Sequence, residues 1–162
     1  MVGAAGASLL AFLLGGCDRQ KIAELEEGVA TEADVRQRFG DPAAVYPETD
    51  GARTFEYPRQ PEGQTNYMIT IGSDGKMSAL RQVLKPADFA KVAAGLDKTQ
   101  VRRLLGRPAV SQFFSLKRQE VWDWRYADGQ EARLFSVTFD ADGRVVSTAS
   151  TLDLRGVVPG GK

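Results

Sequence analysis

The sequence has no histidine, one cysteine and no net charge, with 21 Lys and Arg against 21 Asp and Glu in 162 residues. The lack of histidine excludes Ser-His-Asp and Cys-His catalysis and most zinc sites. A lone cysteine cannot form an internal disulfide. Nucleic-acid binders need a positive field to neutralise phosphates, so the balanced charge argues against that class. The composition favours a binding or structural role, and we expect no catalytic residue, no metal and no nucleic-acid partner.

Charge is also missing from the first seventeen residues, whose apolar centre runs from Leu9 to Leu14. A membrane-spanning helix needs about 20 apolar residues, which is more than this stretch offers. The apolar part of a secretory signal is about 7–15 residues long, which fits. We therefore expect residues 1–16 to be a signal peptide. Its start lacks Lys and Arg, which fits either a true start upstream of Met1 or a weak signal.

The residues Leu14-Gly15-Gly16-Cys17 resemble a bacterial lipobox. The resemblance implies that the chain is cleaved before Cys17, which then carries a diacylglycerol and an N-acyl chain, and we expect no other cofactor. Two or more acyl chains anchor a protein stably. The alternative is an ordinary buried cysteine behind a plain signal peptide. We expect residues 17–21 to be a lipidated tether on a protein that faces the periplasm.

Asp18 follows the predicted lipidated residue and bears on sorting. An aspartate in this place resembles the signal that retains lipoproteins in the inner membrane of enteric bacteria, whereas other bacteria read different positions. Outer-membrane anchoring is the favoured interpretation, and inner-membrane anchoring stays open because of Asp18.

The remainder of the chain is an internal repeat. Gly40 and Pro42 recur 66 residues later as Gly106 and Pro108. The aromatic pair of the segment RTFEYP recurs 67 residues later in EVWDWRY, and the glycine of SDGK recurs 68 residues later in ADGR. The slow drift in spacing indicates single-residue insertions in loops. We therefore expect two similar units, residues 22–84 and 85–152, and a flexible tail at 153–162.

Each unit is predicted to start with two short helices. Apolar residues at helical spacing mark the first helix. They are Ile22, Leu25 and Val29 in the first unit and Phe89, Val92 and Leu96 in the second. Capping patterns at Thr31 and Asp97 start the second helix, and the Gly-X-Pro segments at Gly40 and Gly106 end it.

Strands follow in each unit. Residues 67–71 and 135–139 alternate apolar and polar side chains, and each run leads into an Asp-Gly turn and a last strand at 77–84 or 145–152. An earlier strand carries the aromatic residues of each unit. The sequence therefore predicts an α+β fold of two tandem helix–helix–antiparallel sheet units whose sheets share an edge or abut.

The second unit, from Gly95 through Gly106-Arg107-Pro108 to Trp122-Asp123-Trp124, resembles the SmpA/OmlA family of small outer-membrane lipoproteins, which includes BamE of the β-barrel assembly machine. The first unit matches more loosely. Two such units in tandem also resemble the β-lactamase inhibitory protein architecture. The resemblance implies a non-enzymatic, membrane-anchored module with envelope proteins as partners, among them the β-barrel assembly machine.

Three groups of residues are candidates for partner binding. Trp122 and Trp124 share one face of a strand, where core packing is the other interpretation. Phe113 and Phe114 are adjacent, so in a strand they point to opposite faces and one is expected outside the core. Arg103 and Arg107 belong to a basic cluster that suits anionic lipid or a partner carboxylate, and an ordinary helix surface is the other interpretation.

Three functions compete. The first is a lipid-anchored adaptor in outer-membrane assembly or maintenance that acts by protein–protein binding. The second is an inhibitor or ligand-capture protein of the β-lactamase inhibitory type, which would use a concave aromatic surface between the units. The third is a carboxylate-based hydrolase, which no spacing in the sequence supports.

Overall fold

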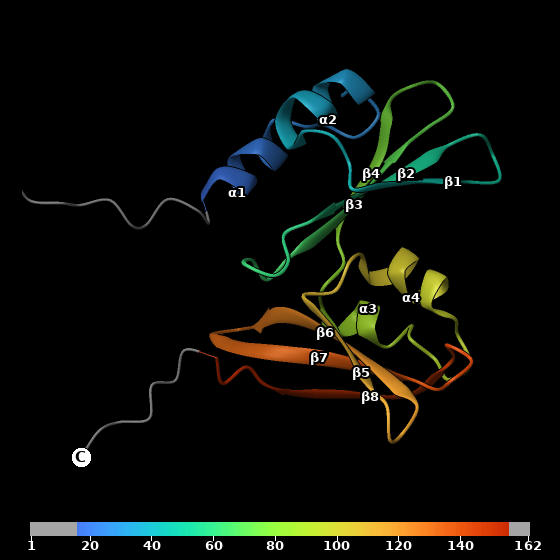
Figure 1. The fold of residues 1–162 in the computed structure, drawn as a ribbon. Coiled ribbons are helices and arrows are strands. Elements are labelled where there is room, and N and C mark those ends of the chain that lie inside the picture. Colours follow the sequence, from blue (N-terminus) through green and yellow to red (C-terminus); the bar gives the residue numbers. More distant parts are fainter. Residues whose placement is uncertain (1–15, 156–162) are drawn as a thin grey trace, which may run out of the picture.

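The computed structural model describes residues 16–155 and contains two four-stranded antiparallel sheets, each with the helices of its own unit on one face (Figure 1). The first unit comprises α1 (Gly16–Ala23), α2 (Glu32–Phe39), β1 (Ala44–Pro47), β2 (Arg53–Pro58), β3 (Asn66–Ile71) and β4 (Met77–Gln82). The second comprises α3 (Pro86–Phe89), α4 (Lys98–Leu105), β5 (Val110–Phe114), β6 (Gln119–Asp128), β7 (Glu131–Phe139) and β8 (Val145–Leu152). The predicted signal peptide up to residue 15, and the tail from residue 156, lie outside the described residues.

The strands follow one another in chain order, β1-β2-β3-β4 and β5-β6-β7-β8, and the two sheets are separate. Every neighbouring pair is antiparallel. The last strand pair of each sheet contains one irregularity, between Thr70 and Ile71 and between Thr138 and Phe139. The α+β prediction is confirmed, and the sheets do not share an edge.

The second helix of each unit begins and ends where the sequence predicts. Thr31 and Asp97 each form a capping box, in which the side chain accepts the N–H of the third helical residue and that residue's side chain bonds back to the cap. Gly40 and Gly106 end the two helices with φ of 81° and 76°. The same local chemistry therefore produces both helices.

The first helices are shorter than predicted. The first unit has α1 ending at Ala23, and Val29, expected on its apolar face, is 60% exposed. Gly28 has φ of +80°, and its N–H donates to the carbonyl of Met77 at 2.7 Å rather than to a helical carbonyl. This bond to the sheet turns the chain away from a helix. Residues 17–21, expected to be a tether, lie within α1.

Two apolar cores lie between helices and sheets. Val35, Phe39 and Phe55 belong to the first core, whereas Val101 and Trp124 belong to the second. The division does not follow the chain, because residues of the first unit also line the second core. They are Met68, Val83 and Leu84. The first sheet thus lies between α2 on one face and α4 of the second unit on the other (Figure 1).

Substitutions at two equivalent glycines, Gly40 and Gly106, can report how closely α4 is packed against the first sheet. Gly40 and Gly106 share a backbone conformation that costs other residues on the order of 1–3 kcal/mol. A Cβ at Gly106 would also lie 2.9 Å from Nδ2 of Asn66, whereas a Cβ at Gly40 meets nothing within 4 Å. Asn66 is fully buried and donates to the carbonyls of Leu105 and Arg107 at 2.7 and 3.0 Å, so it cannot retreat.

We therefore expect Gly106→Ala to lower the free energy of unfolding more than Gly40→Ala does. Urea unfolding of the two variants measures the difference. Equal losses would show that α4 is not held closely against Asn66.

Candidate partner-binding surface

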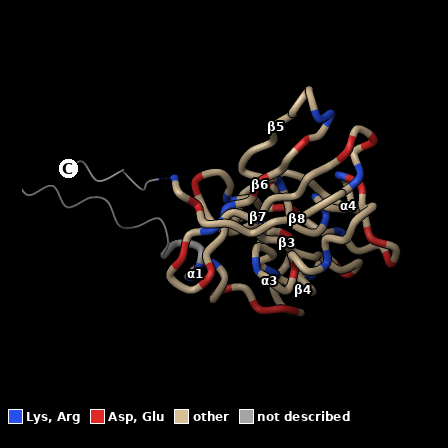
Figure 2. The backbone as a smooth tube through the Cα atoms, turned by 90° about the horizontal axis from the view of Figure 1, so that it is seen from below, with Lys and Arg blue, Asp and Glu red and all other residues tan. Residues whose placement is uncertain are grey.

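The β5–β6 hairpin exposes three large apolar side chains. Phe113 is 64% exposed, Phe114 42% and Leu116 101%. We call these three residues the hairpin patch. The hairpin projects from the body of the protein, with Lys117 and Arg118 at its tip (Figure 2). Large apolar side chains that gather on a projecting element mark an interaction site more often than scattered ones do.

Phe113 and Phe114 point to opposite faces of β5, as predicted. Phe113 is paired with Glu120 and Phe114 with Gln119. Both rings are exposed, whereas the sequence led us to expect only one outside the core. The reason is that β5 is an edge strand that extends beyond the helices, so every residue of β5 is exposed.

A carboxylate near the turn of the hairpin, opposite Phe113, fixes the position of the hairpin. Glu120 accepts hydrogen bonds from Trp122 Nε1 at 2.6 Å and Ser111 Oγ at 2.8 Å, and it forms an ion pair with Lys98 of α4. Burial alone would raise the pKa of Glu120, but the bonds from Lys98, Trp122 and Ser111 outweigh it and lower the pKa below its ordinary value. Glu120 is therefore charged at neutral pH and ties β5 and β6 to α4.

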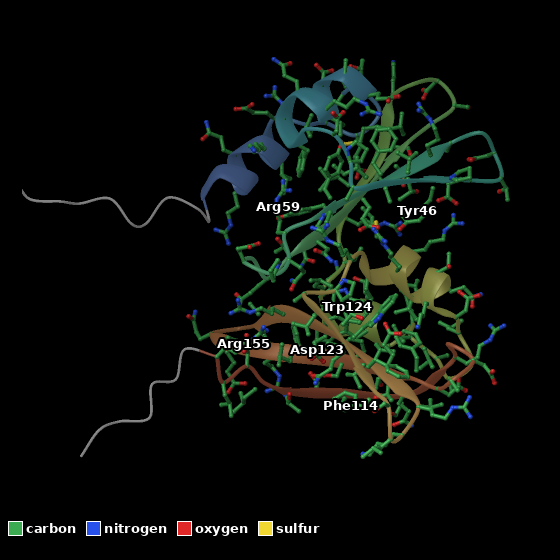
Figure 3. All side chains as sticks on the ribbon, viewed as in Figure 1. Tyr46, Arg59, Phe114, Asp123, Trp124 and Arg155 are labelled. Carbon is green, nitrogen blue, oxygen red and sulfur yellow. The ribbon has the colours of Figure 1, made fainter. Side chains whose placement is uncertain are left out.

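The two tryptophans proposed for partner binding lie against the helices instead. Trp124 is fully buried, and its Nε1 donates to the carbonyl of Gly106 at 3.0 Å (Figure 3). Trp122 is partly buried, and the centre of its ring lies 4.9 Å from the centre of the Phe139 ring. The assignment of Trp124 to a partner surface is wrong, because α4 covers the sheet face on which it lies.

The basic cluster of α4 faces the first unit. Arg103 donates to both carboxylate oxygens of Glu48 at 3.1 Å, and its guanidinium lies 5.3 Å from the centre of the Tyr46 ring. The main-chain N–H of Arg107 donates to Oε1 of Glu56 at 3.0 Å. The carboxylate that Arg103 was expected to meet on a partner is thus supplied by the same chain, whereas Arg107 meets Glu56 through its main chain and not its guanidinium.

Glu56 is the centre of this contact, and the sequence reasoning missed it. Its side chain is fully buried and accepts from Arg102 Nε at 3.1 Å and Nη2 at 3.2 Å, and from Tyr46 Oη at 2.5 Å. Burial, together with the hydrogen bond to Glu56, raises the pKa of Tyr46. A charged residue between the two aromatic residues of β2 was the available signal, because it must face away from its own helices.

The loop between β2 and β3 completes the contact between the units. Gln60 donates to the carbonyl of Arg125 at 2.8 Å and accepts from its N–H at 3.1 Å, so an amide side chain pairs with the edge of β6. Asp153 accepts from Arg125 Nε at 2.7 Å. Burial opposes ionisation of Asp153, but bonds from Arg155 and Arg125 prevail and lower its pKa.

A hollow of about 670 Å³ lies beside this loop. Its cationic lining residues are Arg19, Arg59 and Arg107, and Tyr67 is its aromatic residue. Figure 3 shows Arg59 between α1 and the first sheet, where its guanidinium lies 5.4 Å from the centre of the Phe39 ring. The lining of this hollow is therefore mainly polar and cationic, with one aromatic residue.

Within residues 16–155, no set of three or more Asp, Glu or Cys side chains is placed to hold a metal ion. No helix in the same part of the chain has the length and apolar character to span a membrane. The predicted lipidation and sorting residues, Cys17 and Asp18, fall at the start of α1, where the structure describes the backbone and not their side chains.

Residues 82–149, which run from the last residue of β4 into β8, match the family model of the outer membrane protein assembly factor BamE domain. The second unit resembles the BamE domain. The family resemblance of that unit is confirmed, and the hairpin patch lies within the matched residues. At the family level, the domain indicates an envelope lipoprotein related to outer-membrane assembly.

Solved structures give looser likenesses. A candidate osmotically inducible lipoprotein, OsmE, is 21% identical over 43% of this chain and 82% of its own, with a TM-score of 0.38. The DUF4309 family protein YjgB of Bacillus subtilis is 17% identical over 80% and 83%, with a TM-score of 0.31. A candidate β-lactamase inhibitor protein from Streptococcus mutans is 13% identical over 85% and 97%, with a TM-score of 0.32. Comparison with curated protein sequences gives no match.

Proposed function

We propose that the chain is a lipid-anchored adaptor that faces the periplasm and acts in outer-membrane assembly or maintenance. It binds another envelope protein through the hairpin patch and carries out no catalysis. The BamE domain and the lipobox that ends at Cys17 support the setting. The partners we propose are envelope proteins, and the β-barrel assembly machine is the first to test.

The exposed hairpin carries the binding part of the proposal. Aromatic side chains dominate the energy of protein interfaces when they enter a desolvated pocket. Phe113 and Phe114 lie on opposite faces of one strand, so a partner that clasps the hairpin from both sides would bury both rings. The ion pair between Glu120 and Lys98 holds the strand in place before binding, which reduces the entropy lost on association.

The anchor is tested at the N-terminus. We expect the membrane-bound protein to begin at Cys17 with the mass of a diacylglycerol and an added acyl chain, because one acyl chain alone holds a protein only weakly. Cys17→Ala should leave the protein unlipidated and release it from washed membranes. Mass spectrometry of the N-terminal peptide makes the measurement, and an unmodified thiol on a membrane-bound wild type would refute the anchor.

Density-gradient separation of the two membranes locates the anchored protein. The proposal favours the outer membrane. If Asp18 acts as a retention signal, the wild type will accumulate in the inner membrane and Asp18→Ser will move it outward.

The hairpin patch is tested by a triple substitution to serine at Phe113, Phe114 and Leu116. Because all three side chains are exposed, we expect the melting temperature to change little. Loss of two aromatic anchors should reduce the partner recovered with the lipidated protein from detergent extracts at least about tenfold. Quantitative mass spectrometry of the purified complexes measures this loss.

The matched control replaces two equally exposed apolar residues that lie away from the hairpin, Val29 (60% exposed) and Leu154 (67% exposed), with serine. This variant should retain its partner. Undiminished recovery with the hairpin variant would count against the patch as the binding surface.

A further inference from the structure

The two sheets are equivalent residue by residue, which pairs Glu56 with Asp123. In the first sheet, Glu56 of β2 lies opposite Ala44 of β1 and Met68 of β3. In the second sheet, Asp123 of β6 lies opposite Val110 of β5 and Ser136 of β7. Both carboxylates stand between two aromatic residues whose side chains face the helices. Asp123 therefore occupies the position of Glu56, on the sheet face away from α3 and α4.

In the first sheet, this face is a docking surface for a helix. The C-terminal turn of α4 packs on it, and the guanidinium of Arg102 gives two hydrogen bonds to Glu56. The N–H of Arg107, just after the helix end, gives a third. Met68, directly opposite Glu56, packs into the core of the second unit. A carboxylate at this position thus receives an arginine and the end of a helix.

In the second sheet, the equivalent face is open from Asp123 towards the hairpin; beyond Asp123, on the same face, Arg125 bonds Asp153 and the carbonyl of Pro61. Within residues 16–155 no helix lies on it (Figure 1). Asp123 is half-buried and accepts from Ser136 Oγ at 2.6 Å, and Ala149, opposite Ser136, is exposed. Small side chains around a carboxylate leave room for a helix to approach the sheet.

The open face also reaches the hairpin patch. Gln119 and Val121 alternate with the helix-facing residues of β6, so they share the face of Asp123, and Phe114 is paired with Gln119. A helix laid across this face would therefore contact both the carboxylate of Asp123 and the ring of Phe114.

We propose that the open face of the second sheet docks a helix of a partner protein whose arginine pairs with Asp123, as Arg102 pairs with Glu56. The proposal deepens the proposed function, because it gives the chemistry of the adaptor's partner. The charge of Asp123 selects a cation and disfavours an anionic lipid surface.

A second copy of the chain is a weaker candidate than another protein for supplying the helix that docks at Asp123. Its own residue equivalent to Arg102 is Arg36, 66 positions earlier. Arg36 already bonds Glu32 at 2.9 Å and Asp41 at 2.7 Å and lies 5.0 Å from the centre of the Phe55 ring. Docking of α2 on Asp123 would require Arg36 to leave these partners.

The test places a photo-crosslinking amino acid at Ala149 of the lipidated, full-length protein in living cells. We expect a cross-link to a helix of another protein, within about one turn of an arginine. Asp123→Asn should reduce its yield at least about tenfold, the effect of losing a charged partner in a desolvated pair. Asp128→Asn, at the exposed end of the same strand, and a probe at Gln130 are the controls.

A charge exchange decides the pairing. Asp123→Arg should abolish the cross-link, and substitution of the partner's arginine by aspartate should restore it. The proposal would be overturned by a cross-link from Ala149 to a second copy of the chain, to lipid or within the chain. It would also be overturned if the cross-link did not depend on Asp123, or if no cross-link formed. A probe at Phe113 separates helix docking at Asp123 from partner binding through the hairpin patch. A cross-link at Phe113 without one at Ala149 would refute the docked helix and still support the adaptor function. No cross-link at either position would refute both.

Discussion

Substitution of Glu56 by glutamine is expected to destabilise the protein by about 3 kcal/mol, the lower end of the 3–5 kcal/mol range for a broken buried ion pair. Glu56 is fully buried, and both of its oxygens accept hydrogen bonds, from Arg102, Tyr46 and the N–H of Arg107. The amide of glutamine would turn one of these acceptors into a donor that faces other donors. Arg102 is 37% exposed, so water compensates part of the loss.

Asp123→Asn is the matched control for Glu56→Gln, because Asp123 occupies the same position in the second sheet and is half-buried. We expect a loss of less than about 1 kcal/mol there, since water replaces the missing interaction. Guanidinium unfolding of both variants measures the difference in the free energy of unfolding. Similar values for the two variants would contradict the assignment of Glu56 as the buried centre between the units.

Trp124→Ala is expected to cost about 3–5 kcal/mol, as other large-to-small substitutions of buried tryptophan do. Trp124 is fully buried in the second core, and its indole N–H donates to the carbonyl of Gly106 at 3.0 Å. The first unit repeats this arrangement, because Tyr57 Oη donates to the carbonyl of Gly40 at 3.0 Å. In each unit, an aromatic residue of the sheet thus satisfies the carbonyl at the end of the second helix.

Trp124→Phe separates the two contributions, because it keeps most of the ring and removes the hydrogen bond. It should cost more than an exposed substitution and clearly less than Trp124→Ala. Trp122→Ala, at a partly buried position, should also cost less. Thermal and denaturant unfolding measure all three, and a larger loss at Trp122 than at Trp124 would contradict the packing described.

Local signals predicted most of the helices and strands. The side chains of Thr31 and Asp97 bond N–H groups within their own helices, and Gly75 and Gly143 have φ of +79° and +74° in the turns before the last strands. Both features depend on residues within a few positions, which the sequence displays directly. Because of the internal repeat, each of these signals occurs twice in the chain.

The contact between the units was not predictable from such signals. Glu56 meets Arg102 across 46 positions, and Gln60 meets Arg125 across 65. Periodicity shows that Glu56 faces away from α2 but not that another helix covers it. The prediction that Val29 lies on the apolar face of the first helix was wrong for the same reason. A hydrogen bond from the N–H of Gly28 to the carbonyl of Met77 in β4 sets the turn beside it.

The candidate site was predicted in part. The alternation of side chains in β5 placed Phe113 and Phe114 on opposite faces, and one exposed ring was expected. That both rings are exposed depends on how far the edge strand extends past the helices, which is a property of the assembled fold. The basic side chain of Arg103 was expected to meet a carboxylate, and Glu48 of the first unit supplies it.

The most direct test of the adaptor's role is complementation of a strain that lacks the gene, with outer-membrane permeability to a large antibiotic as the measurement. The wild type and the Val29→Ser/Leu154→Ser control should restore the barrier. The triple hairpin variant, present at the same level and anchored in the same membrane, should fail to do so. Full restoration by the hairpin variant would contradict the conclusion that this chain acts in the envelope through the exposed residues of its β5–β6 hairpin.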